Sequence, residues 1–312
     1  MLIKYLHPSI RLTRTLTGRL ATTGWPVLGV PKHSEEGRRI RTLVRASEGF
    51  SILSVDYSQI ELRVAAELCG DPGLVSAFVN GVDIHALAAH RVLGAPEKKE
   101  DQDESLHRLP AKAANFGYWM GLMSKGLTEA VHKAGRLDWS ANCPGCKFFN
   151  AAHDPDCDSE NFFEEYNRQF PEARRFQLER RNHAERTGTA YGLWGELWSL
   201  PGAWSPHEDI REGCLRQSHA LPIQSGAQRL IKGAMSRISR TDLPWARKRG
   251  MSVSPILQIH DELLFCVENG AVTDWYKRVK KTMESVVEWK VPVVAEGKCG
   301  PSWGEQKKIE GI

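Results

Sequence analysis

Several features of membrane, secreted and repetitive proteins are missing from this sequence of 312 residues. No stretch approaches the roughly 18 consecutive apolar residues that a membrane-spanning helix needs. The first residues, MLIKYLHPSIRLTR, lack the apolar run of a secretory signal. No internal repeat or low-complexity tract is visible, and disulfides are rare in a reducing cytosol, so the seven cysteines are expected as thiols or metal ligands. We therefore expect a cytoplasmic protein without a membrane partner.

The composition is that of a globular protein, with 41% hydrophobic and 26% charged residues. The length suffices for one large domain or two ordinary ones. A net charge of +4 suits a polyanionic partner without demonstrating one. Arginines gather in two clusters, which are either solvated surface charge or a contact for such a partner: Arg38, Arg39, Arg41 and Arg45, then Arg174, Arg175, Arg180 and Arg181.

Two segments place acidic residues at the ends of strands. Residues 50–55 alternate apolar and small polar side chains, which predicts a strand that ends at Asp56 and is followed by a helix. Residues 255–267 are apolar and branched except at His260-Asp261-Glu262, which predicts a β-hairpin with the acidic pair at its tip. The two carboxylates, Asp56 and Asp261, are thus predicted to meet from distant parts of the chain.

Further segments read as helices or loops. We expect helices over 111–123, over 161–187, and over 218–239 with a start near Pro222. Residues 135–159 are rich in Cys, Pro, Gly, Asn and Asp, which indicates a loop or a small insertion.

Paired carboxylates are what two Mg²⁺ ions need, because Mg²⁺ prefers oxygen ligands. Two such ions about 4 Å apart can serve a phosphoryl transfer. A single Asp at a strand end is more often ordinary turn chemistry, so neither Asp56 nor Asp261 decides the matter alone.

A second pattern lies on the helix near residue 112. Arg108, Lys112 and Phe116 are spaced i, i+4, i+8 and line one helical face. Two cations and a ring suit a nucleoside triphosphate, although a basic amphipathic face with a core Phe has the same spacing.

Three longer motifs give a family resemblance. Residues 56–63, DYSQIELR, resemble motif A of family A DNA polymerases; residues 108–117, RLPAKAANFG, resemble motif B; and residues 258–264, QIHDELL, resemble motif C. Weaker likenesses occur at residues 17–20, 36–41, 83–85, 222–224 and 300–303. The motifs follow the family's order, and the likeness covers nearly the whole chain.

The resemblance implies roles for individual residues. Asp56 and Asp261 would hold two Mg²⁺ ions, with Glu262 supporting them and Tyr57 and Gln59 as local scaffolding. Arg108 and Lys112 would grip the dNTP triphosphate, with Lys112 also protonating the leaving pyrophosphate. His85 would reach the phosphates, Phe116 would pack on sugar and base, and Glu61 would be the steric gate against a ribose 2′-OH. The residues implied to contact primer–template DNA are Arg19, Arg216, Gln224, Gln258 and His260.

The implied fold is α+β, a right-hand palm with an antiparallel sheet and helices plus mainly helical fingers. The palm would comprise residues 1–66 and 212–312, and the fingers residues 67–211. Thumb and exonuclease are expected to be absent, which predicts a split polymerase of phage type with a second polypeptide supplying the thumb and acting in a host cytoplasm. An expression fragment and a truncated gene are the alternatives.

One segment is an addition to the family pattern, a possible zinc-binding insertion at about 138–160. Cys143, Cys146, His153 and Cys157 have the spacing of a structural Zn²⁺ site. The alternatives are three free thiols beside a surface histidine, or Asp154 or Asp156 in place of the histidine.

Two other functions are alternatives to a DNA-directed DNA polymerase. A single-subunit RNA polymerase shares the palm, but Glu61 and Glu262 argue against it. A non-catalytic subunit that only binds primer–template DNA would not need Asp56, Asp261 and the triphosphate grip.

Overall fold

A computed structural model describes residues 7–11, 14–24, 26–32, 34–93, 95–121 and 163–310 of the chain. They fold into two compact units. The first comprises residues 1–60, 224–289 and 293–312, and the second comprises residues 61–223 and 290–292. The predicted domain boundaries, after residues 66 and 211, differ from these, and the assignment of palm and fingers stays a prediction.

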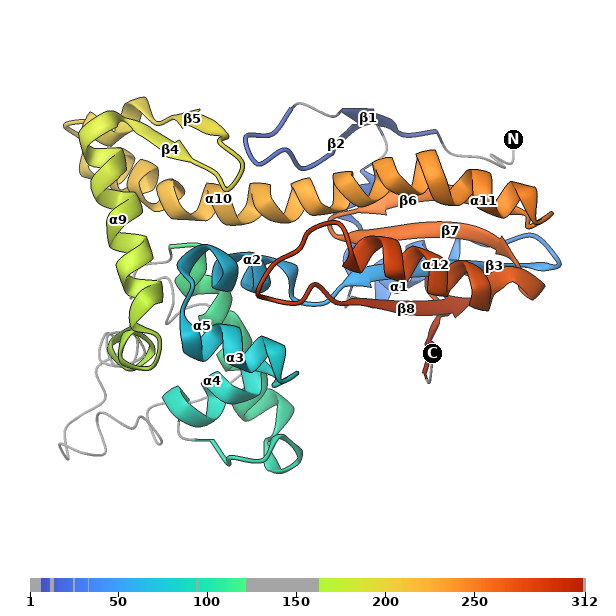
Figure 1. Ribbon diagram of the computed structural model, residues 1–312, viewed down its shortest axis with the longest axis horizontal. Helices are drawn as coiled ribbons and strands as arrows, with labels where there is room; N and C mark the ends of the chain where they lie inside the picture. Colours follow the sequence, from blue (N-terminus) through green and yellow to red (C-terminus); the bar gives the residue numbers. More distant parts are fainter. Residues whose placement is uncertain are drawn as a thin grey trace. The chain divides into compact units, whose positions relative to one another are not determined.

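A five-stranded antiparallel sheet organises the first unit (Figure 1). Its order is β6 (Val253–Ile259), β7 (Glu262–Glu268), β3 (Phe50–Tyr57), β8 (Ala295–Gly300) and β9 (Lys307–Lys308). The central strand β3 pairs along its length with β7, from Phe50 opposite Glu268 to Asp56 opposite Glu262. The predicted strand and the predicted hairpin are therefore both confirmed, and the α+β class with them.

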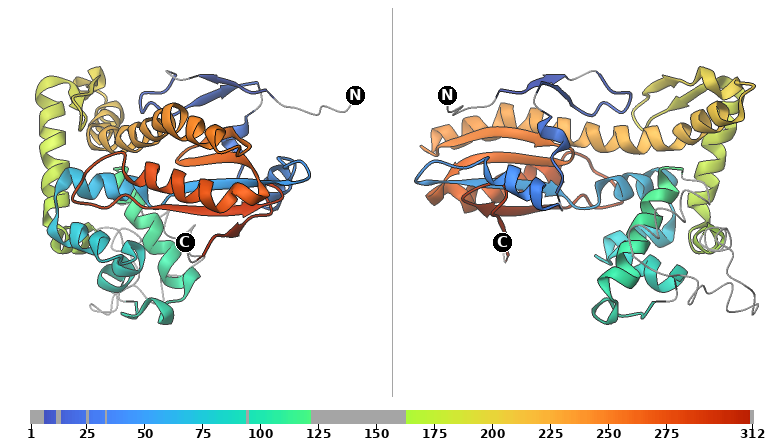
Figure 2. Two further views of the ribbon diagram at one scale, coloured as in Figure 1. Left: turned by 45° about the vertical axis from the view of Figure 1, so that its right-hand side comes forward. Right: turned by 180° about the vertical axis from the view of Figure 1, so that it is seen from behind.

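Helices cover both faces of this sheet, α12 (Val272–Glu284) on one and α1 (Glu35–Thr42) on the other (Figures 1 and 2). On the α12 face, Phe265 meets Trp275 edge to face with ring centroids 5.5 Å apart. On the opposite face, Ile52, Ile259 and Leu264 pack on Trp303. This alternation is the period of two expected for strands, and it puts Asp56 on the same face as Ile52.

The remaining elements of the first unit are short, apart from α10. They are β1 (Ser9–Arg11), β2 (Ala21–Thr23), η1 (Val27–Gly29), the π-turn η6 (Ile238–Asp242), α11 (Leu243–Lys248) and η7 (Asn269–Ala271). The helix α10 (Glu208–Arg237) contributes residues from 224 onward to this unit.

The second unit is mainly helical. Its elements are α2 (Ile60–Cys69), α3 (Pro72–Val79), α4 (Ile84–Leu93), η2 (Lys99–Asp101), the π-turn η3 (Glu104–Arg108), α5 (Leu109–Trp119), a helix over 163–169, α9 (Pro171–Thr187), the hairpin β4 (Thr189–Tyr191) and β5 (Leu197–Ser199), η5 (Pro201–Trp204) and the first part of α10. An aromatic cluster joins α5 to the segments that follow residue 162. Tyr118 lies 4.2 Å from Tyr166 between ring centroids, and Trp119 lies 6.4 Å from Phe176.

Three predicted helix limits are wrong. Residues 161–187 do not form one helix, because Pro171 begins α9 after a break at Phe170. Proline lacks the amide hydrogen needed inside a helix but is favoured in the first turn. By the same rule Pro222 was expected to start a helix, yet it lies inside the 30 residues of α10. Its neighbours Leu221 and Ile223 are buried, and that packing outweighs the lost hydrogen bond.

The helix expected over 111–123 is α5, which ends at Trp119, and residues 122 and 123 lie outside the described part.

Among the described residues, no helix combines the length and apolar character needed to cross a bilayer.

A buried carboxylate secures the region between α10 and α12. The Asp242 side chain is fully buried and accepts hydrogen bonds from Arg278 Nε at 2.6 Å and from Thr282 Oγ1 at 2.6 Å.

Asp242→Ala should lower the free energy of unfolding by about 2–3 kcal/mol, somewhat below the cost of breaking a wholly buried pair because Arg278 is partly solvated. Urea denaturation measures this, with the exposed Arg240→Ala as the control, which should change stability by less than about 0.5 kcal/mol. Equal effects of the two substitutions would contradict this role.

Candidate active site

Two strands of the first unit bring three acidic residues together. Asp56 lies in β3 directly opposite Glu262 in β7, and Asp261 lies in the turn before β7. The amide nitrogen of Tyr57 donates to the carbonyl of Asp261 at 3.2 Å, so backbone bonds fix the strand end to the hairpin tip. The Asp261 side chain is close enough to Asp56 to affect the pKa of that carboxyl. Residues that are 205 positions apart in the sequence thus share one site, as predicted.

The acidic residues line a pocket of about 350 Å³. Its other walls come from residues 28–32, Arg41 and residues 259–260. Lys32 Nζ lies 3.6 Å from Asp56 Oδ2. Arg41 is buried, stacks at 3.9 Å on the Trp303 ring and donates from Nη2 to the carbonyl of Val30 at 3.2 Å.

Burial in the pocket disfavours the charged form of Asp56 and Glu262. Burial raises the pKa of Asp56, and Lys32 only partly offsets this. Burial, and then the charge of Asp56, also raises the pKa of Glu262. The Oδ1 atom of Asp56 is buried without a hydrogen-bond partner among the described residues. A cation at this place would relieve all three conditions, and carboxylate oxygens are the ligands that Mg²⁺ prefers.

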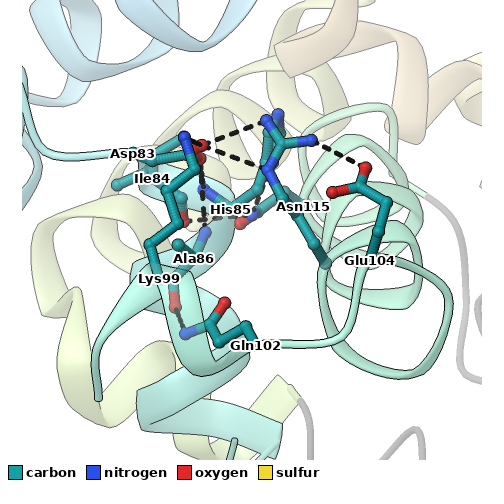
Figure 3. Close-up of polar contacts among 9 residues, drawn as sticks. Asp83, Ile84, His85, Ala86, Lys99, Gln102, Glu104 and Asn115 are labelled. Atoms are coloured by element: carbon teal, nitrogen blue, oxygen red, sulfur yellow. Dashed lines mark hydrogen bonds and ion pairs between the residues drawn. The ribbon is translucent and has the colours of Figure 1, made fainter. Parts of the chain in front are cut away.

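A second polar cluster lies in the second unit (Figure 3). Arg108 donates from Nε and Nη2 to Asp83 Oδ2 at 3.1 and 3.0 Å, and from Nη1 to Glu104 at 3.0 Å. Lys99 Nζ also approaches Asp83 Oδ2, at 2.9 Å. Burial alone would raise the pKa of Asp83, but Lys99 and Arg108 outweigh it and lower the pKa to about 2. Asp83 is therefore a permanent anion, and Arg108 is already paired.

The same aspartate organises the start of α4. Asp83 Oδ1 accepts from the amides of His85 at 3.0 Å and Ala86 at 3.3 Å, which satisfies two free donors of the helix. His85 is only 2% exposed, and burial, then Arg108 and Lys112 against Asp83, lowers its pKa to about 4. It is therefore neutral at neutral pH.

The predicted triphosphate residues occupy one face, as their spacing indicates. Arg108 is partly buried, Lys112 is exposed and Phe116 is half-buried, while the neighbouring Ala111, Ala114 and Asn115 of α5 are buried. His85 and Phe116 have ring centroids 5.8 Å apart. The structure thus brings His85, Arg108 and Phe116 into one cluster.

The predicted scaffolding and DNA residues are distributed over both units. Gln59 has a left-handed backbone, with φ of 52°, and Glu61 begins the second unit. Arg19, Gln224, Gln258 and His260 belong to the first unit, and Arg216 belongs to the second. Gln258 is buried, and its Nε2 donates to the carbonyl of His260, which has a φ of 54°. Gln258 therefore holds the hairpin turn.

Of the two predicted metal centres, only the one at Asp56 and Asp261 lies among the described residues. The zinc candidates Cys143, Cys146, His153 and Cys157 lie outside the described residues. Although Asp56, Asp261 and Glu262 line one pocket, no three His, Cys, Asp or Glu side chains of the described part are placed to bind one metal ion together. Any ion held by Asp56 and Asp261 therefore needs further oxygen ligands from the backbone or from a substrate.

The sequence analysis did not predict the charged side chains that lie beside the predicted site residues. Lys32 and Arg41 share the pocket with Asp56, and Asp83 and Glu104 hold Arg108. The i, i+4 spacing of Glu104 and Arg108 was a visible signal. The contacts of Lys32 and Asp83 depend on the tertiary fold and leave no such signal.

The raised pKa of Asp56 has a consequence for stability. The folded state binds the Asp56 proton more tightly than the unfolded state, so its favourable contribution is complete below the ordinary pKa of 3.8 and is lost as the pH rises through the folded value. Without added metal, Asp56→Asn should therefore raise the free energy of unfolding at neutral pH by about 0.5–2 kcal/mol, the usual range for a stabilising change. The gain should vanish near pH 3.

Thermal unfolding at several pH values measures this effect. The exposed Glu48→Gln serves as the control and should show no such pH-dependent difference. Destabilisation by Asp56→Asn at neutral pH would mean that the ion pair with Lys32 outweighs burial.

Comparisons with known proteins fit this geometry. Residues 3–305 match the DNA polymerase family A. DNA polymerase I of Deinococcus radiodurans is 33% identical over 307 residues, which cover 97% of this chain and 28% of that protein. The thermostable DNA polymerase I of Thermus aquaticus is 29% identical, with 97% and 33% covered. The chain thus spans about a third of the length of these relatives.

A solved structure supports the same assignment. The POL domain of Pol1 from M. smegmatis, in complex with DNA primer-template and dNTP, matches with a TM-score of 0.78 and 28% identity. The match covers 96% of this chain and 48% of that one. With the family match over nearly its full length, the chain belongs to the family A DNA polymerases.

Proposed function

We propose that this chain carries the catalytic palm and fingers of a DNA-directed DNA polymerase, which adds a dNMP to a primer 3′-OH. The observation that carries the proposal is the pairing of Asp56 with Asp261 and Glu262 in one pocket of a family A fold. In the reaction, the 3′-oxygen bonds to the α-phosphorus of the dNTP, the bond from that phosphorus to the bridging oxygen breaks, and pyrophosphate leaves. The hydroxyl proton is lost to solvent or base.

Asp56 and Asp261 are the residues that would hold Mg²⁺, and the donor set fits it. The partnerless, buried Oδ1 of Asp56 and the raised pKa values of Asp56 and Glu262 both favour a cation there. Two Mg²⁺ ions, when bound, would activate the primer hydroxyl and stabilise the leaving group. Glu262 would support the pair from the adjoining strand. Lys32 would move away from Asp56 when the metal binds, so that without metal its ammonium group supplies the positive charge beside this carboxylate.

The triphosphate is assigned to the second unit. Lys112, an exposed cation, would supply attraction and protonate the pyrophosphate, while Arg108 would supply a fixed fork of donors held by Asp83 and Glu104. His85 would add a hydrogen bond to the phosphates and Phe116 a surface for sugar and base. The role of Arg19, Arg216, Gln224 and His260 in DNA binding rests on the family likeness alone.

Primer extension by the purified chain with dNTPs and Mg²⁺ tests the proposal. Asp261→Ala should lower the extension rate by at least about 10³-fold, because a metal ligand is lost. The exposed Glu48→Ala should leave the rate unchanged.

The pattern of results separates the remaining possibilities. Extension that persists in Asp261→Ala would contradict the assignment of the carboxylates. DNA binding without extension, even with a second polypeptide that carries a thumb of this family, would favour a non-catalytic primer–template-binding subunit. Extension only with that polypeptide would support the predicted split enzyme.

Glu61 provides the test against an RNA polymerase. As a steric gate it would exclude ribonucleotides, so Glu61→Ala should raise the efficiency of rNTP relative to dNTP incorporation by about 10–10³-fold, as expected when a clash is removed. Single-nucleotide incorporation with matched rNTP and dNTP measures this ratio. A wild-type chain that already prefers rNTPs would contradict the proposal.

A further inference from the structure

The buried amide of Asn115 joins α5 to the first turn of α4 (Figure 3). Its side chain is 0% exposed. Its Nδ2 atom lies 3.1 Å from Nδ1 of His85 and 3.5 Å from the carbonyl oxygen of Ile84. Its Oδ1 atom has no hydrogen-bond partner among the described residues.

These neighbours fix which way the amide points. The carbonyl oxygen of Ile84 can only accept hydrogen bonds. A flipped amide would turn Oδ1 toward that oxygen and place two acceptors in contact at a buried site, which costs more than one partnerless oxygen. The NH₂ group therefore faces both the carbonyl and the imidazole.

The amide in turn fixes the imidazole. Both Nδ2 hydrogens are donors, so Nδ1 of His85 has to accept and cannot itself carry a proton. In a neutral ring the proton then sits on Nε2. An imidazolium would bring N–H against N–H, which disfavours the charged form in addition to burial.

Burial is the main cause of the lowered pKa of His85, and two of the three nearby charges add to it. Arg108 and Lys112, both on the α5 side, disfavour a cationic ring, while Asp83 on its own loop favours one but is already engaged by Lys99 and Arg108. The net effect is a pKa of about 4.

From this geometry we propose that Asn115 is a positioning residue that locks His85 in the Nε2–H tautomer, so that His85 meets the nucleotide triphosphate as a neutral hydrogen-bond donor. The step toward the nucleotide rests on the function proposed above, whereas the tautomer lock does not. The triphosphate then meets three kinds of donor: a mobile cation at Lys112, a charge-balanced fork at Arg108, and an uncharged directional group at His85. Such a donor keeps its proton across the pH range in which an ordinary histidine titrates.

Nitrogen NMR of the full-length chain with ¹⁵N-labelled histidine tests the lock without any nucleotide. His85→Gln identifies the His85 signals among the 11 histidines. From pH 5.5 to pH 8 we expect an unprotonated Nδ1 and a protonated Nε2 that do not change. A protonated Nδ1, or titration between pH 6 and pH 7, would overturn the proposal.

Asn115→Asp reverses the lock with little change in shape. Its carboxylate can only accept, so it should draw a proton onto Nδ1 and raise the pKa of His85 toward or above its usual value of 6.5. Asn182→Asp adds the same charge at an exposed site on α9 and should leave the His85 signals unchanged. Unchanged His85 signals in Asn115→Asp would count against the proposal. If that variant does not fold, the wild-type spectrum still decides.

The functional arm uses the KM for dNTP in primer extension between pH 6 and pH 8. In the wild-type background, we expect the ratio of KM with His85→Ala to KM without it to be the same at every pH. In the Asn115→Asp background, the same ratio should change with pH by about ten-fold, the scale of one hydrogen bond to a charged group. A KM that is indifferent to His85→Ala would refute the proposed contact of His85 with the triphosphate. The tautomer lock would then stand or fall on the NMR result alone.

Discussion

The antiparallel pairing of β3 with β7 is the constraint on which the candidate site depends. Asp56 and Glu262 are opposite each other only because seven residue pairs, from Phe50 with Glu268 onward, keep one register. Side chains alternate between the faces of a sheet, so a slip by one residue would move the carboxylate of Asp56 to the side covered by α12. The apolar contacts of Phe265 with Trp275 on one face and of Ile52 with Trp303 on the other oppose such a slip. The core therefore stabilises the register, and the register assembles the acidic site.

The two polar clusters of the chain treat charge in opposite ways. In the first unit, burial is the main cause of the raised pKa values of Asp56 and Glu262, and Lys32 offsets it only in part. In the second unit, Asp83 and Glu104 offset Arg108 and Lys99 before any ligand arrives. A cation is thus favoured at the first cluster by the electrostatics of the fold itself. At the second, an anion gains mainly from Lys112 and from donors whose directions are already set, so that cluster favours orientation over net attraction.

Much of this was readable from the sequence, for identifiable reasons. The period-two pattern of residues 50–55 and the hairpin around Asp261 are local signals, and the structure confirms both. The face formed by Arg108, Lys112 and Phe116 also follows from helical spacing. Proline misled at Pro222, because its local preference for helix starts could not reveal that burial of Leu221 and Ile223 carries α10 through that residue. At Pro171 the same preference holds, and a helix begins there.

What the sequence could not give was the set of partners. Lys32 beside Asp56, Asp83 beside Arg108 and Asn115 beside His85 are pairs separated by more than 20 residues, and each depends on how helices and strands pack. Motif likeness implies which residues face a substrate, but the protonation and orientation of those residues depend on the side chains that contact them. His85 illustrates the point. Its sequence context implies only that it reaches the phosphates, whereas burial and one amide make it a neutral donor with a defined proton position. In this chain the chemistry of a site residue is therefore decided as much by the buried residues of α5 as by the exposed ones.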